Sequence, residues 1–281
     1  MSATVTTARH RRAWPIFDTL VVASVILLAI LALVGPMLAP DSAYNSDILN
    51  ALQPPSAGHW CGTDGQGRDV LWRVVIGGRV SLLSALVIVS LYSLIGTLVA
   101  IVAAAGPRWL DEVLMRVTDI GLALPGMVIA LGFASAMGPS LRSAIVAMSI
   151  TGWPITARLL RSILRQTMEA PFVTSARVLG VSTNRLMFRH VLPNSLDVLV
   201  VKWAGDLSTT ILLLGGLSFI GVGAQPPSPE WGAMVADARG YVSTAWWVAA
   251  APGLAIALTS VAFGLLGEVL HAHRDPMLHA K

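Results

Sequence analysis

The chain has 281 residues, of which 55% are hydrophobic and only 12% are charged. Soluble globular chains carry about a quarter charged residues, so this composition excludes an ordinary soluble domain and indicates a polytopic membrane protein. The net charge of +4 does not indicate nucleic-acid binding, because the arginines are spread between apolar segments rather than gathered on one face. The length allows one membrane domain and leaves no room for a separate nucleotide-hydrolysing domain.

The N-terminal segment is expected to be a cytoplasmic arm followed by a membrane anchor. Residues 1–18 contain Arg9, Arg11 and Arg12, which favour the cytoplasmic side. Residues 20–39 form an uncharged run of membrane-spanning length and predict the first span. A secretory signal peptide is the alternative. The retained anchor is favoured because the apolar run is longer than a typical signal core and no clean cleavage site follows it.

Residues 41–79 are polar, rich in proline and glycine, and expected to form an external loop. Four side chains of types that bind metals occur there: His59, Cys61, Asp64 and Asp69. A metal site is the weaker interpretation, because paired His and Cys spacing is absent. The favoured one is a structured turn in which Asp64 and Asp69 accept hydrogen bonds from glycine N–H groups and pair with Arg68 or Arg73. Cys61 is the only cysteine, which excludes an intrachain disulfide.

Three more spans are expected in the middle of the chain. Residues 82–105 predict the second span, with an inside loop at 106–116. Asp119 lies near the cytoplasmic end of the third span, where we expect it to face the bundle and pair with Arg116. The apolar run 120–157 is too long for one span, and a turn signal at 137–140 divides it into two helices joined by an external hairpin. The fourth span should end at Trp153-Pro154 and pass into residues 156–165, where Arg158, Arg161 and Arg165 occur at helical spacing.

The fifth and sixth spans are expected at 194–223 and 246–270. Lys202 and Asp206 are one helical turn apart in the cytoplasmic half of the fifth span and should pair. Two consecutive prolines, Pro226 and Pro227, cannot continue a helix and begin an external loop at 224–245. Three tryptophans in this loop or directly after it suit an interfacial belt: Trp231, Trp246 and Trp247. Residues 271–281 form a polar tail.

Arginine counts set the predicted topology. The cytoplasmic loop 164–192 and its approach contain six arginines, from Arg158 to Arg189, and the N-terminal arm adds three. The positive-inside rule therefore predicts six spans with both termini in the cytoplasm.

One hydrophilic stretch, residues 169–194, stands out between the spans. Pro171 is a helix start signal, and the residues after it recur at helical spacing. The expected shared face consists of Phe172, Ser175, Ala176, Leu179 and Gly180. Small residues on this face let another backbone approach closely. An ordinary helix packed on its own bundle or on the membrane surface remains an alternative interpretation.

The segment FVTSARVLG, residues 172–180, followed by HVLPN at 190–194, resembles the coupling-helix signature of ABC importer permeases. Thr174 stands where the family usually has glutamate, so an ion pair from that position is not implied. The resemblance implies docking on an ATPase subunit through this set: Phe172, Val173, Thr174, Ser175, Ala176, Arg177, Leu179, Gly180, His190 and Pro193.

Three further signatures occur in family order, beginning at His59, Asp111 and Leu217. The tail departs from the family at Gly264, His271 and Ala272. The chain is identified as resembling the C-type permease of dipeptide, oligopeptide or nickel ABC importers. This resemblance implies an all-α fold of six transmembrane helices in the type I importer arrangement, located in a bacterial cell membrane.

The implied partners are a homologous B-type permease, two ATPase subunits, an extracytoplasmic substrate-binding protein and membrane lipid. No Walker A sequence occurs in the chain, so ATP and Mg²⁺ are expected on the ATPase subunits, and no cofactor, metal, nucleic acid or catalytic residue is expected on this one. Peptides are the expected substrate, with nickel or a chelate or haem-like ligand as alternatives. The sequence assigns no substrate-contact residue.

Two other classes of protein are weaker alternatives. A secondary transporter would more often show ionisable residues near mid-membrane or an inverted repeat, and here the charges are expected at span ends. A membrane enzyme would need clustered nucleophiles, bases or metal ligands at membrane depth.

Overall fold

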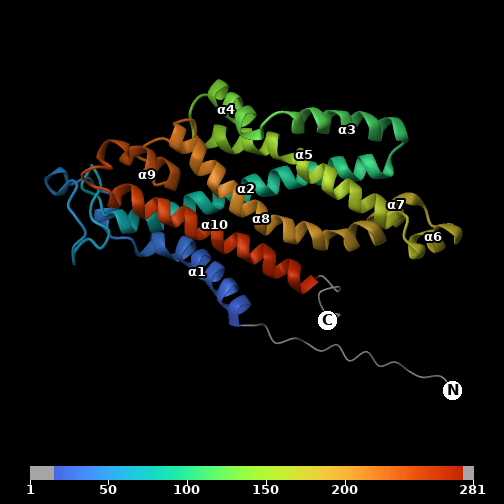
Figure 1. Cartoon of the computed structure of the whole chain (residues 1–281), viewed down its shortest axis with the longest axis horizontal. Helices are drawn as coiled ribbons and strands as arrows, with labels where there is room; N and C mark the ends of the chain where they lie inside the picture. Colours follow the sequence, from blue (N-terminus) through green and yellow to red (C-terminus); the bar gives the residue numbers. More distant parts are fainter. Residues whose placement is uncertain (1–15, 275–281) are drawn as a thin grey trace, which may run out of the picture.

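A computed structural model describes residues 16–274, and in this range the chain is all-α, as predicted. Five long helices form an elongated bundle (Figure 1). They are α1 Ile16–Leu38, α2 Val70–Ala105, α5 Leu141–Met168, α8 Leu192–Ile220 and α10 Trp247–Arg274. Five short helices complete the fold: α3 Arg108–Ala123, α4 Gly126–Met137, α6 Pro171–Val178, α7 Thr183–Leu186 and α9 Trp231–Asp237. The predicted N-terminal arm falls mostly outside the described residues, as does much of the tail.

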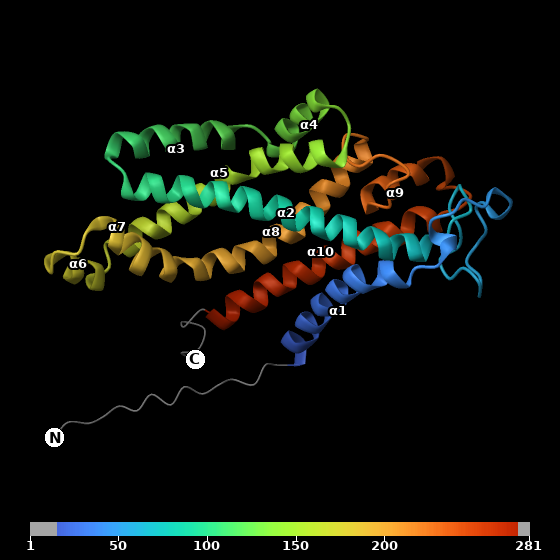
Figure 2. The same ribbon diagram turned by 180° about the vertical axis from the view of Figure 1, so that it is seen from behind.

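The two ends of the bundle carry different structures. Helices α6 and α7 form one end, and α9 with the loop before α2 forms the other (Figures 1 and 2). The start of α1 and the end of α10 lie together, with His273 Nε2 3.6 Å from Asp18 Oδ2. Helix α1 leaves most of its apolar surface uncovered by the rest of the chain, which suits contact with lipid.

Five described helices are long and apolar enough to cross a membrane, and a sixth span exists if α3 and α4 count together. That pair is bent by 87°. Pro125 causes the break, because proline lacks an N–H donor and restricts the residue before it to extended backbone; Leu124 has φ −104° and ψ 143°. The segment predicted as the third span is therefore two helices meeting at a sharp bend, rather than one straight helix.

Three helices have bounds that differ from those of the predicted spans. Helix α2 begins at Val70 rather than at residue 82, since the Asp69 side chain caps it by accepting the Trp72 N–H. Helix α5 continues through Pro154 to Met168, which agrees with the helical spacing predicted for Arg158, Arg161 and Arg165. Helix α8 ends at Ile220, before the two prolines, because Gly221 adopts φ +95° and forms a left-handed cap.

The segment expected as the external loop 224–245 contains α9, which packs against α8 and α10. Trp231 is only 3% exposed, and its Nε1 donates to the Val74 carbonyl at 2.8 Å. Its assignment to an interfacial belt was wrong. The backbone of α9 approaches α8 so closely that a Cβ on Gly232 would lie 2.4 Å from the Gly215 carbonyl oxygen.

Two apolar clusters position the regions discussed next. The central one joins α2, α4, α5 and α8 around Ile88, Tyr92 and Met148. The other lies where α5, α6 and the start of α8 meet, around Leu164, Val173 and Leu186. The second cluster fixes the short helix α6 to the long helix α5.

Candidate functional site

Helix α6 follows α5 after a sharp turn at the end of the bundle. Pro171 occupies its first turn, where the missing N–H needs no partner. The Ser175 hydroxyl donates to the Pro171 carbonyl at 3.0 Å and the Thr174 hydroxyl to the Ala170 carbonyl at 3.4 Å. Because both hydroxyls are satisfied within the helix, they add little polarity to its outer surface.

One side of α6 is anchored to its own subunit. Val173 is fully buried among Leu160, Leu164 and Leu186, and Ala176 packs partly against the same cluster. These two members of the predicted docking set therefore attach the helix to the bundle. The sequence pattern grouped Ala176 with the outer face because small residues tolerate either environment.

The other side of α6 is uncovered within this chain and carries large apolar side chains together with polar ones. Leu179 is 83% exposed and Phe172 is about half exposed; Thr174, Ser175, Arg177 and Gly180 are also exposed. Val178 is as exposed as Leu179 and was missed by the sequence reasoning, which followed the family signature. Large apolar side chains grouped at a surface indicate an interaction site.

Gly180 ends this surface with φ +83°. An added Cβ would meet no atom within 4 Å, so the backbone conformation, rather than space, requires glycine here. The chain reverses at Gly180 toward α7.

His190 and Pro193 lie at the start of the next long helix. His190 belongs to a π-helical segment, Met187–Val191, that leads into α8, and its carbonyl accepts the Asn194 side-chain amide at 2.6 Å. Met187 and Val191 in the same segment are buried. His190 is half-buried and Pro193 is exposed, so this pair flanks the α6 surface at the elbow between α7 and α8.

Ion pairs join α3 to α5 near the α6 end. Asp111 on α3 is buried and binds Arg161 and Arg165 on α5, with Arg165 Nη2 at 2.7 Å. Asp119 pairs with Arg158 of α5. The predicted partner, Arg116, was wrong, since Arg158 is distant in sequence but lies on the facing helix. These ion pairs connect α3 to α5, so that the two helices should move together.

The opposite end has a polar network around the start of α2. Arg68 Nη2 lies 2.8 Å and Arg73 Nε 3.4 Å from Asp64 Oδ2, which confirms the predicted pairing. The backbone donors to the Asp64 carboxylate are Gln66 and Arg68, rather than glycines. Asp69 contacts His59 Nδ1 at 2.8 Å.

Neighbouring Cys61 is half-buried in this network. Burial, and secondarily the Asp69 carboxylate, raise the pKa of its thiol. Within residues 16–274 there is no group of three or more His, Cys, Asp or Glu side chains that could hold a metal ion.

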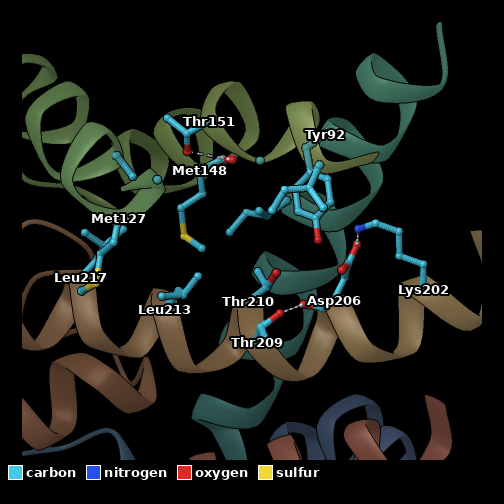
Figure 3. A pocket seen from close by; sticks show the side chains of 15 residues that line it. Tyr92, Met127, Met148, Thr151, Lys202, Asp206, Thr209, Thr210, Leu213 and Leu217 are labelled. Atoms are coloured by element: carbon cyan, nitrogen blue, oxygen red, sulfur yellow. Dashed lines mark hydrogen bonds and ion pairs between the residues drawn. The ribbon is translucent and has the colours of Figure 1, made fainter. Parts of the chain in front are cut away.

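A pocket of about 280 Å³ lies between α2, α4, α5 and α8 (Figure 3). Lys202 and Asp206 of α8 form the predicted ion pair at its polar end. Asp206 lies midway between the ends of α8, Leu192 and Ile220. The expectation that charges lie at span ends does not fit this pair, which lies near the middle of α8 and also of the predicted span 194–223.

Comparison with known proteins identifies what the chain is similar to. The profile of the family described as "Binding-protein-dependent transport system inner membrane component" matches residues 96–279. The probable D,D-dipeptide transport system permease protein DdpC of Escherichia coli K12 is 39% identical over 257 residues, covering 92% of this chain and 86% of that protein.

Other relatives have related names. The dipeptide transport system permease protein DppC of Alkalihalophilus pseudofirmus is 37% identical, covering 94% of this chain and 86% of that protein. The glutathione transport system permease protein GsiD of Pectobacterium atrosepticum is 38% identical, covering 90% and 85%.

The fold is also similar to a solved structure. A chain from the inward-facing MetNI methionine ABC transporter superposes with a TM-score of 0.60 at 18% identity, covering 73% of this chain and 98% of that one. At this identity the likeness shows the fold alone.

Proposed function

The chain belongs to the family of binding-protein-dependent transport system inner membrane components, and we propose that it is the permease subunit through which an ATP-driven importer moves peptides. It is a multi-pass inner membrane protein and a transport subunit rather than an enzyme. Relatives named for D,D-dipeptide, dipeptide and glutathione transport support peptides as the substrate class.

The observation that carries the proposal is the exposed apolar side of α6. Helix α6 is fixed to the bundle by Val173 and presents Phe172, Val178 and Leu179 outward. An ATPase subunit with an apolar cleft is the partner that this surface fits. Burying a leucine or valine side chain contributes about 1.5–3 kcal/mol, so this surface can bind firmly.

The contacts of α6 allow a movement of this helix to be transmitted to the rest of the bundle. It is attached to α5, which runs without interruption from Leu141 to Met168, and α5 is tied to α3 by the Asp111 ion pairs. A displacement of α6 would therefore move α5 and α3 together. ATP-driven closure of the ATPase subunits would in this way rock the permease between outward-open and inward-open states.

The remaining partners follow from this mechanism. A second, B-type permease completes the passage, two ATPase subunits bind ATP and Mg²⁺, and an extracytoplasmic binding protein delivers peptide to the end formed by α9 and the loop before α2. Both termini would be cytoplasmic, which is supported by the position of the α1 start beside the α10 end and by the arginines at 158, 161 and 165.

Uptake by cells tests this function. The chain is expressed with its neighbouring transport subunits in a bacterium that lacks its own peptide importers, and uptake of a radiolabelled dipeptide is measured. Leu179→Asp should abolish uptake without changing the amount of protein in the membrane, because a charge cannot enter an apolar cleft unpaired. Leu179→Met is the matched control, since it keeps an apolar side chain of similar volume at the same position and should leave uptake unchanged. Normal uptake by Leu179→Asp would refute the coupling role.

A further inference from the structure

The pocket between α2, α4, α5 and α8 has two chemically different ends (Figure 3). One end carries Lys202, Asp206 and Tyr92, and the Tyr92 hydroxyl points toward Asp206. The other end is lined by Met127, Met148, Leu213 and Leu217. A ligand that fills it must be charged at one end and apolar at the other.

The ion pair itself lies within α8, and its contact with another helix is through Tyr92 of α2, whose ring centroid is 5.6 Å from Lys202 Nζ. Lys202 and Asp206 lie on the same helix, in an i,i+4 relation, and such pairs contribute only a few tenths of a kcal/mol to a helix. Charged side chains within a membrane span are costly and rare. Here the side chains are mostly buried, with Lys202 12% and Asp206 19% exposed. Within α8 the pair therefore adds little stability compared with the cost of burying two charges.

A zwitterion is the ligand that this pair can accept without leaving a charge unpaired. Its carboxylate would pair with the Lys202 ammonium and its ammonium with the Asp206 carboxylate. Two charge-assisted contacts would then replace the single Lys202–Asp206 contact. The complex would remain neutral. A ligand with one charge would leave either Lys202 or Asp206 buried without its partner, which is strongly unfavourable.

We propose that this pocket is a transient binding site for short zwitterionic peptides with an apolar side chain. Lys202 would bind the peptide carboxylate and Asp206 the peptide ammonium. The proposal rests on the proposed function in peptide import and assigns part of the specificity to the permease itself. The volume of about 280 Å³ lies just below the range of pockets for drug-sized ligands, which suits a peptide of very few residues. Helix α4 lies beside the pocket through Met127, directly after the bend at Pro125, so movement of that bend would change the pocket.

Equilibrium binding to the complete transporter in nanodiscs, without the binding protein, tests the assignment. The probes are radiolabelled L-alanyl-L-phenylalanine, its C-terminal amide and its N-acetyl derivative. The wild-type complex should bind the zwitterion about tenfold or more tightly than either derivative, because each lost charged hydrogen bond leaves a buried partner unsatisfied.

Two single variants should then invert this preference. Lys202→Met leaves Asp206 alone and should bind the cationic amide best. Asp206→Leu leaves Lys202 alone and should bind the anionic N-acetyl peptide best. The double variant should lose all preference while the complex keeps its thermal stability. A merely structural pair would instead lower the affinity for all three probes equally, and that result, or equal affinities in the wild type, would overturn the proposal.

Uptake by cells separates this proposal from the one on which it rests. If the wild-type transporter imports the dipeptide but its nanodisc complex shows no charge preference, the pocket assignment fails and the import function stands. If cells take up no peptide, both fail. Uptake together with inverted preferences supports both.

Discussion

Leu179→Ala should weaken the attachment of the ATPase subunit by an amount that the structure allows to be calculated. The leucine side chain is 83% exposed, so nearly all of its surface is free to be buried by a partner. Truncation removes three carbons at about 0.8 kcal/mol each, or about 2.4 kcal/mol in all; scaled by the 83% of the residue that is free to be buried, the loss is about 2 kcal/mol, a roughly 30-fold weaker complex. Alanine is a good helix former, so α6 itself should persist.

The assay is titration of purified ATPase subunit onto the permease pair in nanodiscs, with affinity measured by interferometry. Leu49→Ala controls for loss of an exposed leucine elsewhere, because Leu49 is 92% exposed at the other end of the bundle. A change within about twofold of wild type is what an ordinary surface substitution produces. That result for Leu179→Ala would show that the outer side of α6 is not the docking surface.

Three further perturbations have defined outcomes. Asp111→Asn should lower the thermal stability of the purified protein by about 1–3 kcal/mol, because Arg161 loses its partner at a partly buried site; unchanged melting in detergent would contradict the tie between α3 and α5. Gly232→Ala should destabilise the fold, since its Cβ would meet backbone at 2.4 Å, whereas Gly253→Ala, with nothing within 4 Å, should be tolerated; equal yields of folded protein would refute this packing. Cys61 should react slowly with an impermeant maleimide at neutral pH, and its rate should still be rising after that of free cysteine has levelled off, because the raised thiol pKa keeps the reactive thiolate scarce; rapid neutral labelling would refute the burial.

The sequence was sufficient for features that depend on local chemistry. Long uncharged runs predict the spans, and the pairing of Lys202 with Asp206 follows from their spacing alone. Pro171 marked the start of α6 correctly. The pairing of Asp64 with Arg68 was predictable for the same reason, since both residues lie in one short turn.

Features that depend on contacts between distant segments could not be predicted. Asp119 pairs with Arg158 rather than nearby Arg116, because the choice is made by the packing of α3 on α5. Trp231 looks like an interfacial residue until the carbonyl of Val74, far away in the sequence, is placed beside it. The pocket needs four helices to exist, so no local pattern could reveal that the Lys202 pair faces a cavity.

The bounds of α2 and α5 could not be predicted from prolines and charged residues alone. Pro154 marks the predicted end of the fourth span, and α5 continues through it to Met168. The charged residues before position 82 suggested a loop, but Arg73 is buried and donates to the Pro227 carbonyl at 3.1 Å. A satisfied arginine of this kind is compatible with a helix.

Site-directed photo-crosslinking from the outer surface of α6 tests the central claim most directly. A benzophenone amino acid is placed at position 179 of the chain assembled with its transport subunits in cells, and the product formed on illumination is identified by mass spectrometry. We predict a covalent adduct with an ATP-hydrolysing subunit, and no such adduct from position 49. Adducts from position 179 that contain only this chain, or only an extracytoplasmic protein, would contradict this prediction.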